Sequence, residues 1–228
     1  MGFNWYPEPQ GAGMDQGQAL AGSVPSPFEV CEAGDIRALI EAYPLAWVQA
    51  VDAGEASLLP MIGVFDGDDR LVELIGHFGR TNPLHAAFLE HGRASILFTG
   101  PQGYISPSQA GRRNWGPTWN YAQVQVEAEV SVESDLTPEA VDLLVDHVEK
   151  DRAEPWSAAE LGERYDLLMP MIIGFRARVT GLKAVFKLGQ TEDDQTFRAI
   201  MANLPEGDLK AWMRRFDHRG EDAKEEGE

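Results

Sequence analysis

The segment Gly76–Pro83 contains residue types that bind anions when they stand at the start of a helix. Asn82 is a favourable N-cap, and Pro83 fits the first helical position, where its missing N–H loses no hydrogen bond. A helix start presents unpaired N–H groups and partial positive charge, and Arg80 adds a planar guanidinium beside it. The segment therefore predicts a site for a phosphate or a carboxylate. The alternative is a surface arginine next to an ordinary helix cap.

Conventional catalytic and metal-binding motifs are absent from the sequence. The five histidines are scattered, and Cys31 is the single cysteine, so neither a zinc site nor an intrachain disulfide is expected. The sequence also has no nucleophile elbow, no P-loop and no dinucleotide fingerprint. No residue can be named as a catalytic acid or base, which leaves open whether the chain is an enzyme.

The charge of the chain bears on its partners. Its net charge is −18, from 37 acidic and 19 basic residues, and such a chain repels nucleic acid at long range. DNA binding is therefore disfavoured, although a dimer with a local basic face would still allow it. No apolar run reaches the length of a membrane span, and the first residues lack the features of a signal peptide. We expect a cytoplasmic protein without a membrane partner.

The elements that must position the anion-binding segment are mainly β-strands. Apolar and polar residues alternate from Ala122 to Val132, which is typical of a strand with one buried face. Several antiparallel strands close together favour a barrel over a sheet built from β–α–β units. Strands are expected at Leu45–Val51, Ser57–Phe65, Leu71–His77, Ala94–Thr99, Ala122–Val132 and near Met171–Phe186.

Helical spacing of apolar residues predicts five further helices around the strands. One precedes the first strand, two interrupt the strands after residue 136, and two follow the last strand. Their expected buried stripes are Ile36, Leu39, Ile40 and Tyr43; Val141, Leu144, Val145 and Val148; Leu161, Tyr165 and Leu168; Phe197, Ile200, Met201 and Leu204; and Leu209, Trp212, Met213 and Phe216.

Five short motifs, taken in order and spacing, resemble those of the PaiB-like, FMN-binding negative transcriptional regulators. They are Ser57-Leu58-Leu59-Pro60; Gly76-His77 with Arg80 and Asn82-Pro83; Gly100-Pro101 with Tyr104-Ile105-Ser106-Pro107-Ser108; Pro117-Thr118-Trp119-Asn120-Tyr121; and Lys183 with Lys187-Leu188 and Gln190. The resemblance implies a mainly β fold with helices, namely a split β-barrel of the FMN-binding, pyridoxamine-oxidase-like type with helical additions. It also implies a homodimer with FMN at the subunit interface.

The resemblance divides the chain into three parts. Residues 1–27, rich in Gly, Pro and Gln, are expected to form a flexible N-terminal arm. Residues 28–204 would form the FMN-binding split-barrel domain, with a helical insertion at about 137–169. Residues 205–228 would contribute a C-terminal helix and an acidic tail.

The resemblance also implies roles for the residues of the motifs. Arg80 would pair with the FMN phosphate, and His77 would bind the ribityl chain or the phosphate unless it is a structural histidine. Trp119 would stand beside the flavin or fill the dimer interface, and the two lysines would contact an anion. The predicted cofactor-binding residues are Ser57, Leu58, Leu59, Pro60, His77, Arg80, Asn82, Trp119, Asn120, Lys183, Lys187 and Gln190.

One departure from the family pattern bears on flavin affinity. The family usually has an aromatic pair after Ser-Pro-Ser, where this chain has Gln109-Ala110. Three functions stay open at this point. The first is an FMN-dependent transcriptional regulator or sensor, and the second is a flavin reductase or oxidase acting on a small molecule. The third is a haem-binding split barrel in which His77, His85 or His91 would bind the iron.

Overall fold

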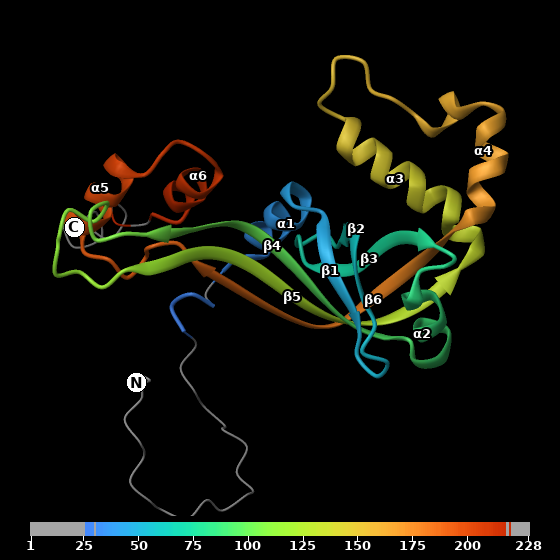
Figure 1. Ribbon diagram of the computed structural model, residues 1–228, viewed down its shortest axis with the longest axis horizontal. Helices are drawn as coiled ribbons and strands as arrows, with labels where there is room; N and C mark the ends of the chain where they lie inside the picture. Colours follow the sequence, from blue (N-terminus) through green and yellow to red (C-terminus); the bar gives the residue numbers. More distant parts are fainter. Residues whose placement is uncertain (1–25, 30, 218, 220–228) are drawn as a thin grey trace, which may run out of the picture.

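Six antiparallel strands form a closed barrel in the order β1-β2-β3-β6-β5-β4 (Figure 1). The computed structural model describes residues 26–29, 31–217 and 219, so the expected N-terminal arm and acidic tail lie almost entirely outside the described residues. The barrel and its helices confirm the predicted split-barrel fold. The strands are β1 Leu45–Ala50, β2 Ala56–Phe65, β3 Leu71–Gly79, β4 Arg93–Ile105, β5 Thr118–Glu133 and β6 Ile172–Lys187.

Helices surround the barrel in three groups. Two helices, α1 and α2, lie within the first half of the chain; a second group is inserted between β5 and β6, and α5 and α6 follow β6. The second and third groups lie near opposite ends of the long strands (Figure 1). None of the helices in the described part of the chain is long and apolar enough to span a membrane. The bounds are α1 Ala33–Ala42, α2 Pro83–His91, α3 Thr137–Glu149, α4 Glu163–Leu168, α5 Asp194–Asn203 and α6 Asp208–Arg215, with 3₁₀ helices η1 Ser134–Leu136, η2 Ala158–Leu161 and η3 Met169–Met171.

Strands β4 and β5 are longer than the sequence pattern predicts, whereas β6 has the predicted length. Beyond Phe98, β4 no longer pairs with β1 and continues with β5 alone as far as Ile105. The register shifts between Thr99 and Gln102, where Gly100 and Pro101 interrupt the ladder. A proline lacks the N–H that a ladder needs, so a bulge is where a strand can accommodate it. The three strands therefore extend past the barrel as an arm.

The barrel interior confirms the alternation seen in the sequence. Val124, Val126 and Ala128 of β5 are buried, while Gln125 and Glu127 between them are exposed. The predicted stripes of α1, α5 and α6 also contribute buried side chains to the core, among them Leu39, Ile40, Phe197, Ile200, Met213 and Phe216. One continuous core therefore joins the barrel to these helices.

The predicted stripes of the two inserted helices are only partly buried, and Val148 and Leu168 within them are exposed. Helix α3 buries Ala140 against Ile75 of β3, with Leu143 beside them, whereas Val148 is 48% exposed. Helix α4 buries none of its residues, and Leu168 is also exposed. The buried residues of α3 are Thr137 and Ala140, whose small side chains allow close packing on the strand, so the most buried side of the helix lies beside the centre of the predicted stripe.

Candidate cofactor site

The start of α2 is built as the sequence predicts. Asn82 Oδ1 accepts a hydrogen bond from the Leu84 N–H at 3.0 Å, and Pro83 is the first helical residue. Leu84, Ala87 and Phe88 are buried, which fixes the helix against the barrel. The Ser57 hydroxyl donates to the same Asn82 oxygen at 3.2 Å, although the two residues are 25 positions apart. The first two family motifs therefore meet at this helix start.

Arg80 is exposed beside the helix start and is held by two backbone carbonyl groups. Its main-chain N–H donates to Met171 O and its Nε donates to Pro170 O, both at 2.9 Å. Its own carbonyl oxygen lies 3.1 Å from His85 Nδ1. These contacts order the base of the guanidinium group, and neither carbonyl neutralises its charge.

The charge of Arg80 is unusual in so acidic a chain. Among the described arginines, all except Arg80, Arg113 and Arg164 form an ion pair with a carboxylate. Of these three, Arg80 stands beside the N-terminus of a capped helix. An unneutralised guanidinium close in sequence to the positive end of a helix dipole can bind a phosphate group.

We expect Asn82→Ala to destabilise the protein by about 1 kcal/mol, because it removes the side-chain cap of α2. The change also removes the acceptor for the Ser57 hydroxyl. Urea unfolding followed by circular dichroism measures the loss. Asn82→Asp keeps a cap oxygen and serves as the control, so an equal loss in both variants would contradict the capping role.

His77 lies on the outer side of β3, underneath α3. Its neighbour Phe78 points into the barrel core, and Ile75, two residues earlier, packs against Ala140 of α3. The Nδ1 atom of His77 is buried and has no hydrogen-bond partner within the described residues. Burial lowers the pKa of the His77 imidazole. This placement is that of a histidine packed between a strand and a helix.

Acid is expected to weaken the folded state through His77. Because its folded-state pKa is lowered, the unfolded chain takes up the proton first as the pH falls below about 6.5. The free energy of unfolding contributed by the neutral ring is therefore present at neutral pH and is lost as the pH falls toward the folded-state pKa. His77→Gln should show a smaller fall in melting temperature between pH 7 and pH 5.5 than the wild type. The exposed His91, changed to Gln, is the control that should retain the wild-type fall.

The motif residues on β2 alternate between the core and the surface. Leu59 is buried in the barrel, Pro60 is half-buried, and Leu58 is 58% exposed on the outer face. Leu58 pairs with Trp47 of β1, which is 47% exposed. Sequence reasoning missed Trp47, although its position between the buried Ala46 and Val48 indicates an outward-facing side chain.

The residues of the fourth and fifth motifs lie farther along the arm. Trp119 is 50% exposed, its Nε1 donates to Gln102 Oε1 at 2.6 Å, and its ring lies 6.0 Å from that of Tyr104. Lys187 Nζ donates to Thr118 Oγ1 at 2.5 Å. These side chains form an exposed aromatic and basic group on β4, β5 and β6.

Lys183 is already paired within the chain. Its Nζ lies 2.8 Å from a carboxylate oxygen of Glu29, and this hydrogen bond raises the pKa of Lys183. The neighbouring Phe28 accepts a hydrogen bond at its carbonyl oxygen from the Phe186 N–H, so the segment before α1 runs along the edge of β6. The charge of Lys183 is therefore partly neutralised in this structure.

Asn120 and Gln190 lie away from the exposed face. Asn120 is 2% exposed, and its Nδ2 lies 3.6 Å from Met213 Sδ of α6, on the side of β5 opposite Trp119. Gln190 closes its own turn, because its Oε1 accepts from the Leu188 N–H at 2.7 Å. Both side chains occupy structural positions in this arrangement.

The departure Gln109-Ala110 is also accounted for by local structure. Gln109 Oε1 accepts a hydrogen bond from the Ser106 N–H at 2.9 Å, and Ala110 is buried in the core. The loop that follows is fastened to the start of α5, since Arg112 donates to Asp193 at 2.8 Å. These residues hold a turn, and they do not add an aromatic surface.

A single subunit keeps the two groups of motif residues apart. The register aligns Leu58, Trp47, Leu97, Gln125 and Lys183 across the outer face of five strands. Trp119 stands six positions before Gln125 on β5, which corresponds to about 20 Å along an extended strand. The helix start near Ser57 and the aromatic group at Trp119 therefore lie at different points of one long face.

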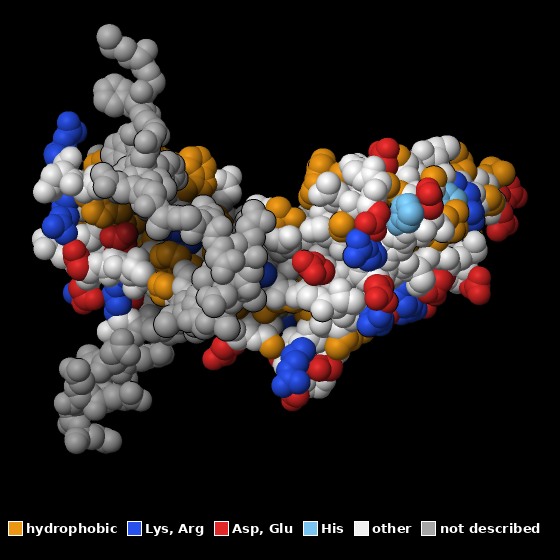
Figure 2. Space-filling model, turned by 90° about the horizontal axis from the view of Figure 1, so that it is seen from below, with side chains coloured by type: hydrophobic (Ala, Val, Ile, Leu, Met, Phe, Trp, Pro, Cys, Tyr) orange, Lys and Arg blue, Asp and Glu red, His pale blue; other side chains and the backbone are white. Residues whose placement is uncertain are grey.

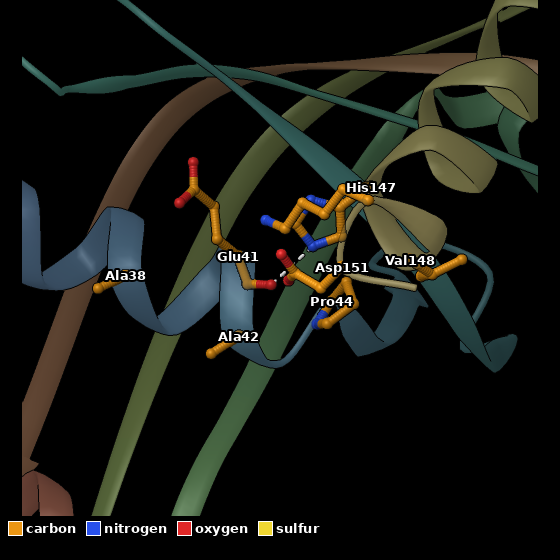
Figure 3. A pocket seen from close by; sticks show the side chains of 8 residues that line it. Ala38, Glu41, Ala42, Pro44, His147, Val148 and Asp151 are labelled. Carbon is orange, nitrogen blue, oxygen red and sulfur yellow. Dashed lines mark hydrogen bonds between the residues drawn. The ribbon is translucent and has the colours of Figure 1, made fainter. Parts of the chain in front are cut away.

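An open groove of about 530 Å³ lies between α1 and α3, away from the motifs (Figure 3). His147 Nε2 lies 2.7 Å from the carbonyl oxygen of Glu41 and so joins the insertion to α1. The Glu41 carboxylate is in turn bonded to Arg37 Nε at 2.9 Å. The contact between His147 and Glu41 thus joins the two helices, and the Arg37–Glu41 bond lies within α1.

Comparison with known proteins identifies the family. A family model described as "Putative FMN-binding domain" matches residues 23–181. The chain is 28% identical over 185 residues to "Protease synthase and sporulation protein PAI 2" of Bacillus subtilis (strain 168), covering 79% of this chain and 88% of the relative. A FAD and haem binding protein of Mycobacterium smegmatis is similar with a TM-score of 0.49 and 18% identity, over 76% of this chain and 79% of that one. A flavocytochrome of Azotobacter vinelandii is similar with a TM-score of 0.47 and 17% identity, over 76% of this chain and 74% of that one. Because the family model spans more than half of the chain, the protein belongs to the PaiB-like family of FMN-binding split-barrel proteins.

Proposed function

We propose that the protein is a homodimeric, FMN-dependent regulator or sensor, in which Arg80 and the N-terminus of α2 bind the phosphate of FMN. The observation that carries this proposal is the unneutralised guanidinium of Arg80 just before a capped helix start, with Nε bonded to Pro170 O and the main-chain N–H bonded to Met171 O. A phosphate dianion is a chemical group that matches an unneutralised guanidinium near the positive end of a helix dipole. The flavin supplies any redox chemistry, and the chain supplies binding and orientation.

The homodimer is supported by the apolar character of the outer face. Leu45, Trp47, Leu58, Tyr104 and Trp119 are exposed large hydrophobic residues on β1, β2, β4 and β5. Monomeric proteins rarely expose apolar patches of this kind, and a twofold dimer buries the same patch on both subunits. A second copy also gives a way for both groups of motif residues to reach one flavin, since a single subunit separates them.

The regulatory role is supported by the family resemblance, whereas the charge of the chain opposes direct DNA contact. On the face shown in Figure 2, Lys and Arg side chains lie beside Asp and Glu side chains, and no broad basic surface is visible on the part that is coloured. The net charge of −18 also opposes DNA binding. The single cysteine is consistent with a cytoplasmic location.

Reconstitution with FMN tests the proposal. The purified protein, mixed with FMN, should quench flavin fluorescence with a dissociation constant in the micromolar range or tighter, and it should elute as a dimer. Specific retention of DNA at physiological salt would assign it a direct repressor role, while salt-labile retention without sequence preference would not. The proposed function would be contradicted if the protein did not bind FMN at a concentration of about 100 μM. A dissociation constant of that size corresponds to a binding free energy of roughly −5.5 kcal/mol.

A further inference from the structure

The end of the helical insertion contacts the candidate phosphate site directly. The Arg80 N–H bond to Met171 O continues the β3–β6 ladder by one residue beyond the pair Gly79 and Ile172. The second bond, from Arg80 Nε to Pro170 O, comes from the 3₁₀ helix η3 that precedes β6. In Figure 1 the inserted segment runs from α4 back to the start of β6. The insertion is thus joined to Arg80 through the backbone and through the side chain.

The two bonds determine what the guanidinium can still do. With Nε engaged by Pro170, the guanidinium plane is oriented, while its two Nη groups have no carboxylate partner among the described residues. A long arginine side chain loses considerable rotamer freedom when it binds a ligand, and a hydrogen bond that orders it beforehand reduces that loss. The Nη pair is the part of the fork that can bind two oxygens of one phosphate.

Pro170 is suited to hold this carbonyl group in place. Its ring fixes φ near −65°, which restricts the backbone of η3 at the residue whose oxygen accepts from Arg80. A carbonyl group has no side-chain signature, so the sequence pattern around Arg80 does not reveal this contact.

We infer that Pro170 is a positioning residue for phosphate recognition: its carbonyl oxygen holds Nε of Arg80, so that both Nη groups remain available for the phosphate of FMN. The inference rests on the proposed function and adds the helical insertion to its site. It predicts that a change in η3 affects the phosphate of the ligand and not the flavin ring.

The test compares FMN with riboflavin, which lacks the phosphate, in the full-length protein. Pro170→Gly keeps the carbonyl group but frees its backbone, so it should raise the dissociation constant for FMN by up to about tenfold, the limit set by one orienting hydrogen bond to a charged group, and leave that for riboflavin unchanged. Pro155→Gly is the matched control, because Pro155 lies in the same insertion, is exposed, and forms no contact with Arg80. It carries the same backbone change and should bind both ligands as the wild type does.

Two further variants keep the inference testable if Pro170→Gly folds poorly. Arg80→Lys retains the charge but has no Nε donor and no fork, so it should lose FMN affinity nearly as much as Arg80→Ala. In the Arg80→Ala background, Pro170→Gly should have no additional effect on FMN, because the residue it positions is absent.

The outcomes separate the inference from the proposed function. If the wild type binds FMN and Pro170→Gly binds it equally well, or loses FMN and riboflavin together, the positioning role is overturned and the FMN site stands. Additive effects of the two changes, or wild-type FMN affinity in Arg80→Lys, overturn it as well. If the wild type binds no flavin, the proposed function itself fails, and the inference fails with it.

Discussion

Arg80→Ala is expected to weaken FMN binding roughly 10- to 100-fold while leaving riboflavin binding unchanged. The guanidinium is the charged group at the start of α2, and an arginine–phosphate hydrogen bond is among the strong ones. Only FMN carries the phosphate, so the loss should be specific to it. Titration of flavin fluorescence with both ligands measures the difference.

Arg164→Ala is the matched control for this experiment. Arg164 is also an exposed arginine outside the ion pairs of the described residues, but it lies on α4 and has no contact with the start of α2. It removes the same charge from the protein, so it should alter FMN binding little at physiological salt. An equal loss of FMN and riboflavin in Arg80→Ala would remove Arg80 from the phosphate site.

Trp47→Glu is expected to convert the proposed dimer to monomers, with a dissociation constant for the dimer at least about 100-fold higher. Trp47 lies in the middle of the exposed apolar row on β1, between Leu58 of β2 and Leu97 of β4. A carboxylate at this position would be buried against apolar side chains of the second subunit without a partner. Sedimentation or mass photometry over a concentration series measures the equilibrium.

The matched control for this change is Leu167→Glu. Leu167 of α4 is 71% exposed, more than Trp47, yet it lies outside the outer face of the barrel. If both variants stay dimeric, the subunit contact is elsewhere and the proposed shared flavin site must be revised. If Trp47→Glu is monomeric and still binds FMN with wild-type affinity, one subunit is sufficient for the cofactor.

The start of α2 could be predicted from local sequence, whereas the contacts that distant residues make with it could not. The start of α2 was predictable because capping and proline preference act over a few neighbouring residues. The contact between Ser57 and Asn82 joins two motifs through the barrel, and the register of the strands determines it. The carbonyl groups that hold Arg80 come from residues about 90 positions away, and no side-chain pattern marks them.

The errors in the inserted helices have a related cause. Spacing correctly predicted that residues 137–149 are helical, since the 3.6-residue period is a property of the segment itself. It predicted the buried face only in part, because α3 rests on β3 through Ala140, beside the centre of the predicted stripe, and Val148 is exposed. For α4, exposed Leu167 and Leu168 show that an apolar helix pattern does not ensure burial.

The sequence by itself determined the barrel strands, the capped start of α2 and the family, since each depends on local periodicity, capping chemistry or ordered motifs. Only the tertiary structure decided that Asn120 and Trp119 face opposite sides of β5, that Lys183 pairs with Glu29, and that the insertion holds Arg80. The physical reason is that strand register and chain connections bring distant residues together. Every residue has a backbone carbonyl group, whatever its side chain, so the sequence does not show which carbonyl group makes such a contact.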